Sequence, residues 1–278
     1  MIQLVYYGYV AFSAVARWLP ERFVYGVANL AGTIAVRFSK KRAVVAGNLA
    51  RITGQPADSP AVQRLVREAY NSYARYWLET FRLVREDATF FLERFRARGD
   101  ENLWSVVDSG RGAVVAVCHL GNWDAGGAWV GAKSHSLVTV AEVLKPRRMF
   151  EFFADHRARL GMTIFGAEPG VTKKLAAAAE GGAVVAILAD RDLKGTGPLV
   201  EFFGAPAHLP AGAASIALET GCPLLAAGIY GTTFEDGTRG WEAHITEPIE
   251  VPAVRTEGTV AEVTQRIARR MEELIAHR

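Results

Sequence analysis

The sequence predicts an α/β protein with a central, mostly parallel β-sheet flanked by helices, preceded by an N-terminal helical membrane-associating region. From about residue 112, short apolar runs alternate with amphipathic stretches, a pattern typical of a parallel sheet covered on both faces. Residues 2–95 have helical patterning instead. Half of the 278 residues are apolar, enough for a large core. We expect a helical region at 1–95 that packs on the core and faces a membrane, and an α/β core at 96–278, together forming one continuous structural domain.

The N-terminal region is expected to consist of four helices. The first two span residues 2–18 and about 21–38. The third follows the turn at Ser39-Lys40-Lys41 and ends near Ile52. The fourth spans about 59–84, and Ser59-Pro60 supplies its N-cap and a proline at the first helical position. The last helix carries an aromatic stripe at three- and four-residue spacing: Tyr70, Tyr73, Trp77 and Phe81. Packing against the α/β core is the favoured interpretation of this stripe.

The first fifty residues are apolar and basic. Six Lys and Arg face one acid, Glu21, so this segment carries +5 and the remainder of the chain −2. Such a segment suits anionic lipid headgroups, although a solvated helical face with a charged turn is the alternative. Leu4 to Ala16 is uncharged but shorter than the roughly twenty residues that span a bilayer. We expect residues 2–18 to lie in or on the membrane interface, with no secretory signal because no basic residue precedes the apolar run.

Other partners are not indicated. No expected helix carries a long basic stripe, so we expect no nucleic acid. The two cysteines, Cys118 and Cys222, form neither a CxxC pair nor a zinc spacing, so we expect no metal and a reducing, cytoplasmic setting.

The α/β core is expected to alternate strands and helices. The expected strands are Ala113–Cys118, Leu137–Ala141, Met162–Phe165, Ala183–Ala189, Leu224–Ile229 and Trp241–Ile245, and the expected helices cover 122–132, 147–160, 171–180, 211–220 and 257–276. Two of these strands are similar in sequence, and they end in His119 and Asp190. Because the carboxyl ends of parallel strands form the site in open α/β sheets, both residues could face one crevice.

The segment His119-Leu-Gly-Asn-Trp-Asp124 is the strongest indication of a catalytic site in the sequence. Gly121 permits a tight turn, and Asn122 can cap the next helix and place Asp124 in its first turn. From there Asp124 could reach one imidazole nitrogen and leave the other as a base. The alternative is a core histidine whose polar atoms are satisfied by a helix-start aspartate.

The reaction expected of such a base is direct. No G-x-S-x-G elbow is present, which disfavours a serine hydrolase. Cys118 precedes His119 on the same strand and should point to the opposite face, which disfavours a cysteine nucleophile. The remaining mechanism is a direct one. His119 takes a proton from an acceptor hydroxyl, and the hydroxyl oxygen then attacks a thioester carbonyl.

These residues resemble a known family. The His119…Asp124 pair is similar to the HX4D motif of the glycerolipid and lysophospholipid acyltransferases. Over nearly its whole length the chain resembles the bacterial lipid A acyltransferase family, and within it the actinobacterial phosphatidylinositol mannoside acyltransferases. The stretches that carry the resemblance are Ser72–Trp77, His119–Asp124, Thr139–Glu142 with Leu144–Pro146, Arg157–Gly161, Ala189–Leu193, Phe202–Gly204 and Pro210–Gly212.

The resemblance implies a peripheral enzyme of glycolipid biosynthesis at the cytoplasmic face of the cell membrane. It would move a long acyl chain from acyl-CoA, as co-substrate and without a cofactor, to a mannose hydroxyl of a phosphatidylinositol mannoside. His119 would be the general base, and a carboxylate at the position of Asp190 would pair with it. Mannoside acyltransferases tend to have Glu there, so the shorter Asp190 puts a direct contact in doubt and a bridging water is the alternative.

The resemblance also implies binding residues. Glu142 and Arg157 match polar positions of the family site, and Asp124 would either orient His119 or brace Arg157. Arg191 belongs to the matched cluster after Asp190. The alternatives without a binding role are a surface acid at Glu142, a salt-bridged helix residue at Arg157 and a solvated turn around Arg191.

Several further features stay open. Lys145, with Arg147 and Arg148, would meet phosphates of coenzyme A or of the acceptor lipid, or form a solvated basic turn. The segment 202–204 and the helix after 210–212 would wall an acyl tunnel or belong to the core. Relatives usually continue beyond the last expected helix, so we expect some contacts to be built differently in this chain. The alternative functions are acylation of another glycolipid, such as a lipid A precursor, and non-catalytic lipid binding on the same fold.

Overall fold

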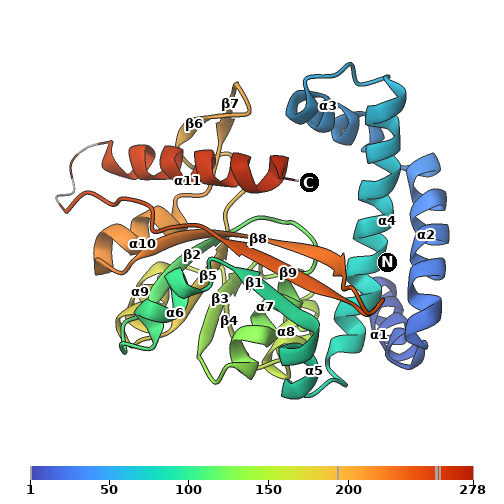
Figure 1. The fold of residues 1–278 in the computed structure, drawn as a ribbon, viewed down its shortest axis with the longest axis horizontal. Helices are drawn as coiled ribbons and strands as arrows, with labels where there is room; N and C mark the ends of the chain where they lie inside the picture. The colour runs from blue at the N-terminus through green and yellow to red at the C-terminus, as the bar shows by residue number, and fades with distance from the viewer. Residues whose placement is uncertain (1, 193, 254–255, 257, 278) are drawn as a thin grey trace. The chain divides into compact units, whose positions relative to one another are not determined.

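A computed structural model describes residues 2–192, 194–253, 256 and 258–277. Leu193, in one of the matched stretches, lies outside the described residues. The chain divides into two compact units, Gln3–Arg85 and Glu86–Arg278 (Figure 1).

The first unit is helical, as expected. Its helices are α1 (Ile2–Trp18), α2 (Glu21–Phe38), α3 (Arg42–Thr53) and α4 (Pro60–Leu83). The hydroxyl of Ser59 accepts a hydrogen bond from the amide of Val62, which caps α4 at the predicted position. The rings of Trp77 and Phe81, from the aromatic stripe, contact the rings of Tyr9 and Phe12 on α1. Among the described residues, no helix is both long and apolar enough to cross a membrane.

The second unit contains the predicted α/β fold. Its sheet has the strand order β1-β9-β8-β2-β5-β3-β4. All neighbouring pairs are parallel except β8 and β9. The bounds are β1 (Phe95–Arg98), β2 (Ala113–Val117), β3 (Leu137–Ala141), β4 (Met162–Gly166), β5 (Val184–Leu188), β8 (Leu224–Thr233) and β9 (Arg239–Ile245). The mostly parallel sheet is therefore confirmed, and β1 is an addition to it.

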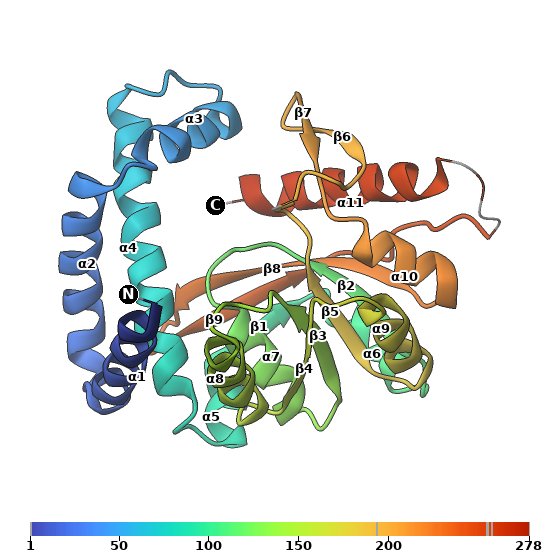
Figure 2. The same ribbon diagram turned by 180° about the vertical axis from the view of Figure 1, so that it is seen from behind.

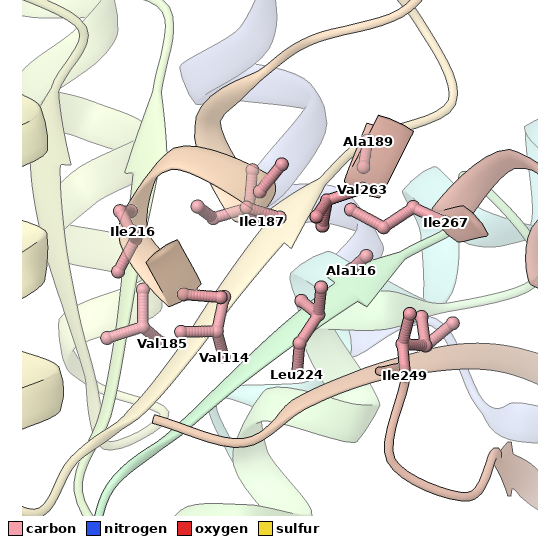
Figure 3. Close-up of a cluster of buried hydrophobic side chains, with 14 of the residues drawn as sticks. Val114, Ala116, Val185, Ile187, Ala189, Ile216, Leu224, Ile249, Val263 and Ile267 are labelled. Carbon is pink, nitrogen blue, oxygen red and sulfur yellow. The ribbon is translucent and has the colours of Figure 1, made fainter. Parts of the chain in front are cut away.

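Helices cover both faces of this sheet. Helices α9 (Val171–Glu180), α10 (Gly212–Thr220) and α11 (Thr259–Ala276) enclose the main apolar core on one face (Figure 3). On the other face lie α5 (Ala88–Arg94), α6 (Glu101–Val107), α7 (Trp123–Ala132) and α8 (Arg147–Ala158). The view from behind shows α7 and α8 on the opposite side of the sheet from α10 and α11 (Figure 2). The continuous apolar runs of the central strands follow from this double cover.

Strand alternation assigns side chains to these faces. Val114, Ala116 and Cys118 of the β2 segment belong to the core under α9, α10 and α11. Val115 and Val117 are also buried, and they point to the other face because the side-chain period of a strand is two.

The segment between β5 and α10 contains a strand pair that the sequence did not predict. Strands β6 (Leu199–Phe202) and β7 (Ala205–His208) form a separate hairpin, with both Phe203 and Gly204 at positive φ in the turn. Phe202 packs against the main core, and Ala213 and Ala214 of α10 are buried in it. For these residues the structure favours the core alternative over the tunnel wall.

Candidate active site

His119 and Asp190 are brought together by strand register. Strands β2 and β5 are parallel neighbours in which Val117 lies opposite Leu188. Two residues further along each strand direction stand His119 and Asp190. Their preceding neighbours, Cys118 and Ala189, are both buried in the main core. Alternation therefore directs His119 and Asp190 to the face opposite that core, at the carboxyl edge of the sheet.

The two side chains are in direct contact. The Nδ1 atom of His119 lies 2.6 Å from Oδ1 of Asp190. The backbone N–H of His119 donates to Oδ2 of the same carboxylate at 3.0 Å. The direct contact that the shorter aspartate put in doubt is therefore present, because the register brings the residues close enough for this side chain to reach the ring.

This pairing determines what the ring can do. A carboxylate at Nδ1 favours the tautomer that carries its proton there and leaves a lone pair on Nε2. The His119 side chain is 33% exposed and that of Asp190 15% exposed, so an incoming group can reach the ring. Among the described residues, no protein group forms a hydrogen bond with Nε2 of His119. The arrangement suits a general base.

The turn after His119 depends on residues that the sequence singled out. Gly121 has φ 54°, and a Cβ there would lie 2.3 Å from the carbonyl oxygen of Ile229. Only glycine fits such a position without displacing the backbone. Asn122 then caps α7 by accepting a hydrogen bond from the amide of Ala125 at 3.1 Å. The Trp123 ring, which sequence reasoning did not single out, packs edge-to-face with the His119 ring, with centroids 5.1 Å apart.

Asp124 contacts Arg157. Its Oδ1 lies 2.6 Å from Nε of Arg157, and its side chain is 1% exposed compared with 18% for the arginine. Of the two alternatives for Asp124, the structure therefore favours the brace on Arg157. The contact with the His119 ring that its five-residue spacing allowed is made by Asp190 instead. The ion pair joins the first turn of α7 to the last turn of α8.

Cys118 is not available as a nucleophile. It is fully buried, as its strand position predicted. Burial raises the pKa of the Cys118 thiol strongly, and the nearby negative charge of Asp190 raises it further. The group therefore stays a thiol at neutral pH.

The remaining predicted binding residues lie at the same edge of the sheet but are not assembled into contacts. Glu142 and Lys145 follow β3, Arg191 follows β5, and all three are exposed. Within the described part of the chain they form no hydrogen bond or ion pair. Arg147, by contrast, already pairs with Glu168 at 2.9 Å and Glu151 at 3.5 Å.

Sequence reasoning gave Asp192 no role of its own. Its carboxylate accepts hydrogen bonds from the amides of Lys194 at 2.9 Å and Gly197 at 2.7 Å. These backbone donors, that of Gly197 above all, lower the pKa of Asp192. Asp192 thus shapes the loop that follows Asp190, a role that an aspartate before a Gly-rich turn could have indicated.

The fold and this site define a class of protein: an α/β protein with a carboxylate-held histidine at a strand end, followed after four residues by an aspartate. The sequence matches the family model described as bacterial lipid A biosynthesis acyltransferase over residues 2–278. It is 35% identical to a phosphatidylinositol mannoside acyltransferase of Mycolicibacterium smegmatis, an alignment that covers 97% of this chain and 86% of that protein. A protein of the same name from Mycobacterium tuberculosis is 34% identical, with 97% of this chain and 84% of that protein covered. The chain belongs to the bacterial lipid A biosynthesis acyltransferase family, and the resemblance deduced from its motifs is confirmed.

Proposed function

We propose that the protein transfers a long-chain acyl group from acyl-CoA to a mannose hydroxyl of a phosphatidylinositol mannoside. It would do so as a peripheral enzyme at the cytoplasmic face of the cell membrane. The observation that carries the proposal is the His119–Asp190 pair at the carboxyl edge of the sheet. The acceptor is supported by two relatives that are named phosphatidylinositol mannoside acyltransferases and that align with 97% of the chain.

His119 acts as the base in this proposal. Its Nε2 accepts the proton of the mannose hydroxyl while the oxygen attacks the thioester carbonyl of acyl-CoA. The tetrahedral intermediate collapses, a C–O ester bond replaces the C–S bond, and the coenzyme A thiolate leaves. The imidazolium then returns its proton to the thiolate, so the enzyme ends the cycle unchanged.

Asp190 positions the base and stabilises its charged form. The carboxylate accepts both the ring Nδ1–H and the backbone N–H of His119. An ionised carboxylate next to an imidazolium lowers the free energy of the charge that forms during proton transfer. Asp124 has an indirect role, because it holds Arg157 rather than the ring.

The exposed residues of the same edge are proposed to bind substrate. Lys145 and Arg191 are cationic side chains suited to the phosphates of coenzyme A or of the acceptor lipid. Glu142 would accept hydrogen bonds from sugar hydroxyls, and Arg157, held in place by Asp124, would supply positive charge beside the substrate.

A transfer assay tests the proposal against its alternatives. Purified protein is given radiolabelled palmitoyl-CoA with a mannosylated phosphatidylinositol, with a lipid A precursor, or with no acceptor. We expect the wild type to transfer the label to the mannoside. We expect the His119→Ala variant to lose this transfer. Transfer to the lipid A precursor alone would reassign the acceptor. Lipid binding without turnover on any acceptor would favour the non-catalytic alternative.

A further inference from the structure

The ring of His119 is held by Asp190 at one atom only. The hydrogen bond to Nδ1 is 2.6 Å long, yet the His119 side chain is 33% exposed. The torsion that turns a histidine ring about its Cβ–Cγ bond has broad energy wells, so one hydrogen bond leaves the ring room to rotate. A base must keep Nε2 aimed at the acceptor hydroxyl, because a displacement of about 1 Å can cost a factor of about a hundred in rate. A second restraint on the ring would therefore support catalysis.

Trp123 supplies this second contact. Its ring and that of His119 have centroids 5.1 Å apart and planes inclined at 78°, which is the edge-to-face geometry that aromatic rings favour. Within the part of the chain that the structure describes, Asp190 and Trp123 are the residues that contact the His119 ring through a hydrogen bond or ring packing. A rotation of the imidazole away from Asp190 would disrupt this packing. The two residues therefore restrain the same rotation in different ways.

The backbone that carries Trp123 is fixed on both sides. Before it, Asn122 is 1% exposed and caps α7 through its hydrogen bond with the amide of Ala125. After it, the side chain of Asp124 is 1% exposed and forms the ion pair with Arg157. Trp123 is the first residue of α7, so its ring starts from a backbone position with little freedom. A ring carried in this way can hold a neighbour in place.

Packing of α7 on the sheet does not account for Trp123. The buried residues of α7 are residues 124–130, and Trp123 itself is only partly buried. A close contact with the sheet is made further along the helix, where a Cβ at Gly126 would lie 2.4 Å from Cδ1 of Ile229. Trp123 precedes this contact, at the end of α7 next to His119. Its ring is therefore placed to act on the histidine rather than to fill the core.

We propose that Trp123 is a positioning residue for the general base. Its ring limits the rotation of the His119 imidazole, so that Nδ1 stays on Asp190 and the lone pair of Nε2 stays directed at the acceptor hydroxyl. Trp123 accepts no proton and forms no covalent bond in the reaction. This inference rests on the proposed function, because it concerns the base of that reaction.

Three variants of Trp123 separate a positioning role from simple bulk. Trp123→Ala removes the ring, Trp123→Leu keeps apolar volume without an aromatic edge, and Trp123→Phe keeps an aromatic ring. The matched control is Trp104→Ala, because Trp104 on α6 is also partly buried and packs its ring against a histidine, His135, with centroids 5.0 Å apart. Helix α6 precedes β2 and His135 precedes β3, so this pair lies at the amino edge of the sheet, away from His119.

The first measurement is steady-state acyl transfer from acyl-CoA to the mannoside. We expect Trp123→Ala and Trp123→Leu to lose about tenfold in kcat, with KM values near those of the wild type. Trp123→Phe should stay within about threefold of the wild type, and Trp104→Ala within about twofold. A loss in kcat with unchanged KM indicates an interaction that acts in the transition state rather than in substrate binding.

The second measurement needs no substrate. The nitrogen NMR shifts of the His119 ring, recorded at alkaline pH, report which ring atom carries the proton. In the wild type we expect the proton on Nδ1 and a lone pair on Nε2. In Trp123→Ala the two nitrogen shifts should move towards each other, because a ring that rotates away from Asp190 shares its proton between both atoms. They should stay unchanged in Trp104→Ala and in Trp123→Phe.

A kcat and nitrogen shifts of Trp123→Ala that match those of Trp104→Ala would overturn the inference. A rise in KM with unchanged kcat, or a fall in kcat with unchanged nitrogen shifts, would also overturn it and make Trp123 a substrate contact. If thermal unfolding shows that Trp123→Ala does not fold, Trp123→Leu provides the same two readings. Absence of acyl transfer in the wild type would refute the proposed function alone, since the nitrogen shifts are measured without substrate.

Discussion

Replacing Asp190 with asparagine tests whether its carboxylate sets the proton position on His119. In the wild type, one carboxylate oxygen faces Nδ1 at 2.6 Å and the other accepts the backbone N–H of His119 at 3.0 Å. The backbone N–H can only donate, so the oxygen of an asparagine would remain on it. The asparagine NH2 group would then face Nδ1, which could accept its hydrogen bond only by losing its own proton.

The consequence is a ring in the wrong tautomer. The proton would move to Nε2, the atom that must accept a proton from the acceptor hydroxyl. General-base catalysis contributes about 10²–10⁴-fold, so we expect kcat to fall by about that factor. The substitution is isosteric and keeps a hydrogen bond to both the backbone N–H and the ring of His119, so the free energy of unfolding should change by less than about 1 kcal/mol.

The assay is acyl transfer with acyl-CoA and acceptor varied separately, combined with thermal unfolding of each variant. Asp190→Glu keeps the charged acceptor and should retain more activity than Asp190→Asn. Asp236→Asn is the charge control, because the Thr238 amide lowers the pKa of Asp236 in the exposed β8–β9 turn and keeps it ionised. A kcat for Asp190→Asn within about threefold of the control would refute the role of the pair.

Three further predictions concern the site and its support. Cys118→Ala should keep transfer activity. The wild-type protein should resist alkylation by iodoacetamide at neutral pH, since burial raises the pKa of the Cys118 thiol. Rapid alkylation of Cys118 with loss of activity would contradict this. Gly121→Ala should destabilise the protein more than Gly110→Ala does in denaturant unfolding. Both glycines have positive φ, but only Gly121 lies against a carbonyl group, that of Ile229. Equal losses of unfolding free energy in the two variants would refute the close approach of Gly121 to this carbonyl. Arg157→Met should cost about 3 kcal/mol of unfolding free energy, because Asp124 is 1% exposed; a loss under about 1 kcal/mol would show that other groups hold the carboxylate.

The predictable parts of this protein have local signals. The central strands are uninterrupted apolar runs, and the double helical cover explains why they lack polar alternation. The similarity between the strands before His119 and Asp190 predicted a shared crevice, and the parallel register of β2 and β5 places the two residues opposite each other. Cys118 was correctly assigned to the core from alternation alone.

The unpredicted parts depend on tertiary packing. The spacing between His119 and Asp124 fits a contact with the ring as well as one with Arg157, and the packing of α7 near α8 decides between them. Strand β1 has four residues, two of them arginine, and it pairs with β9 more than 140 positions away. The β6–β7 hairpin has a proline in its second strand, which is atypical of strands. Its two-residue turn also needs a positive φ at Phe203, a conformation that phenylalanine rarely adopts.

The most direct test of the central claim is chemical rescue of a variant that lacks the proposed base. His119→Gly should lose at least about a thousandfold in the rate of acyl transfer to the mannoside. Added imidazole should restore part of this rate in proportion to its concentration, because the ring of His119 is partly exposed and its removal leaves room at the carboxylate of Asp190. Transfer by His119→Gly at the wild-type rate without imidazole would contradict the assignment of His119 as the base.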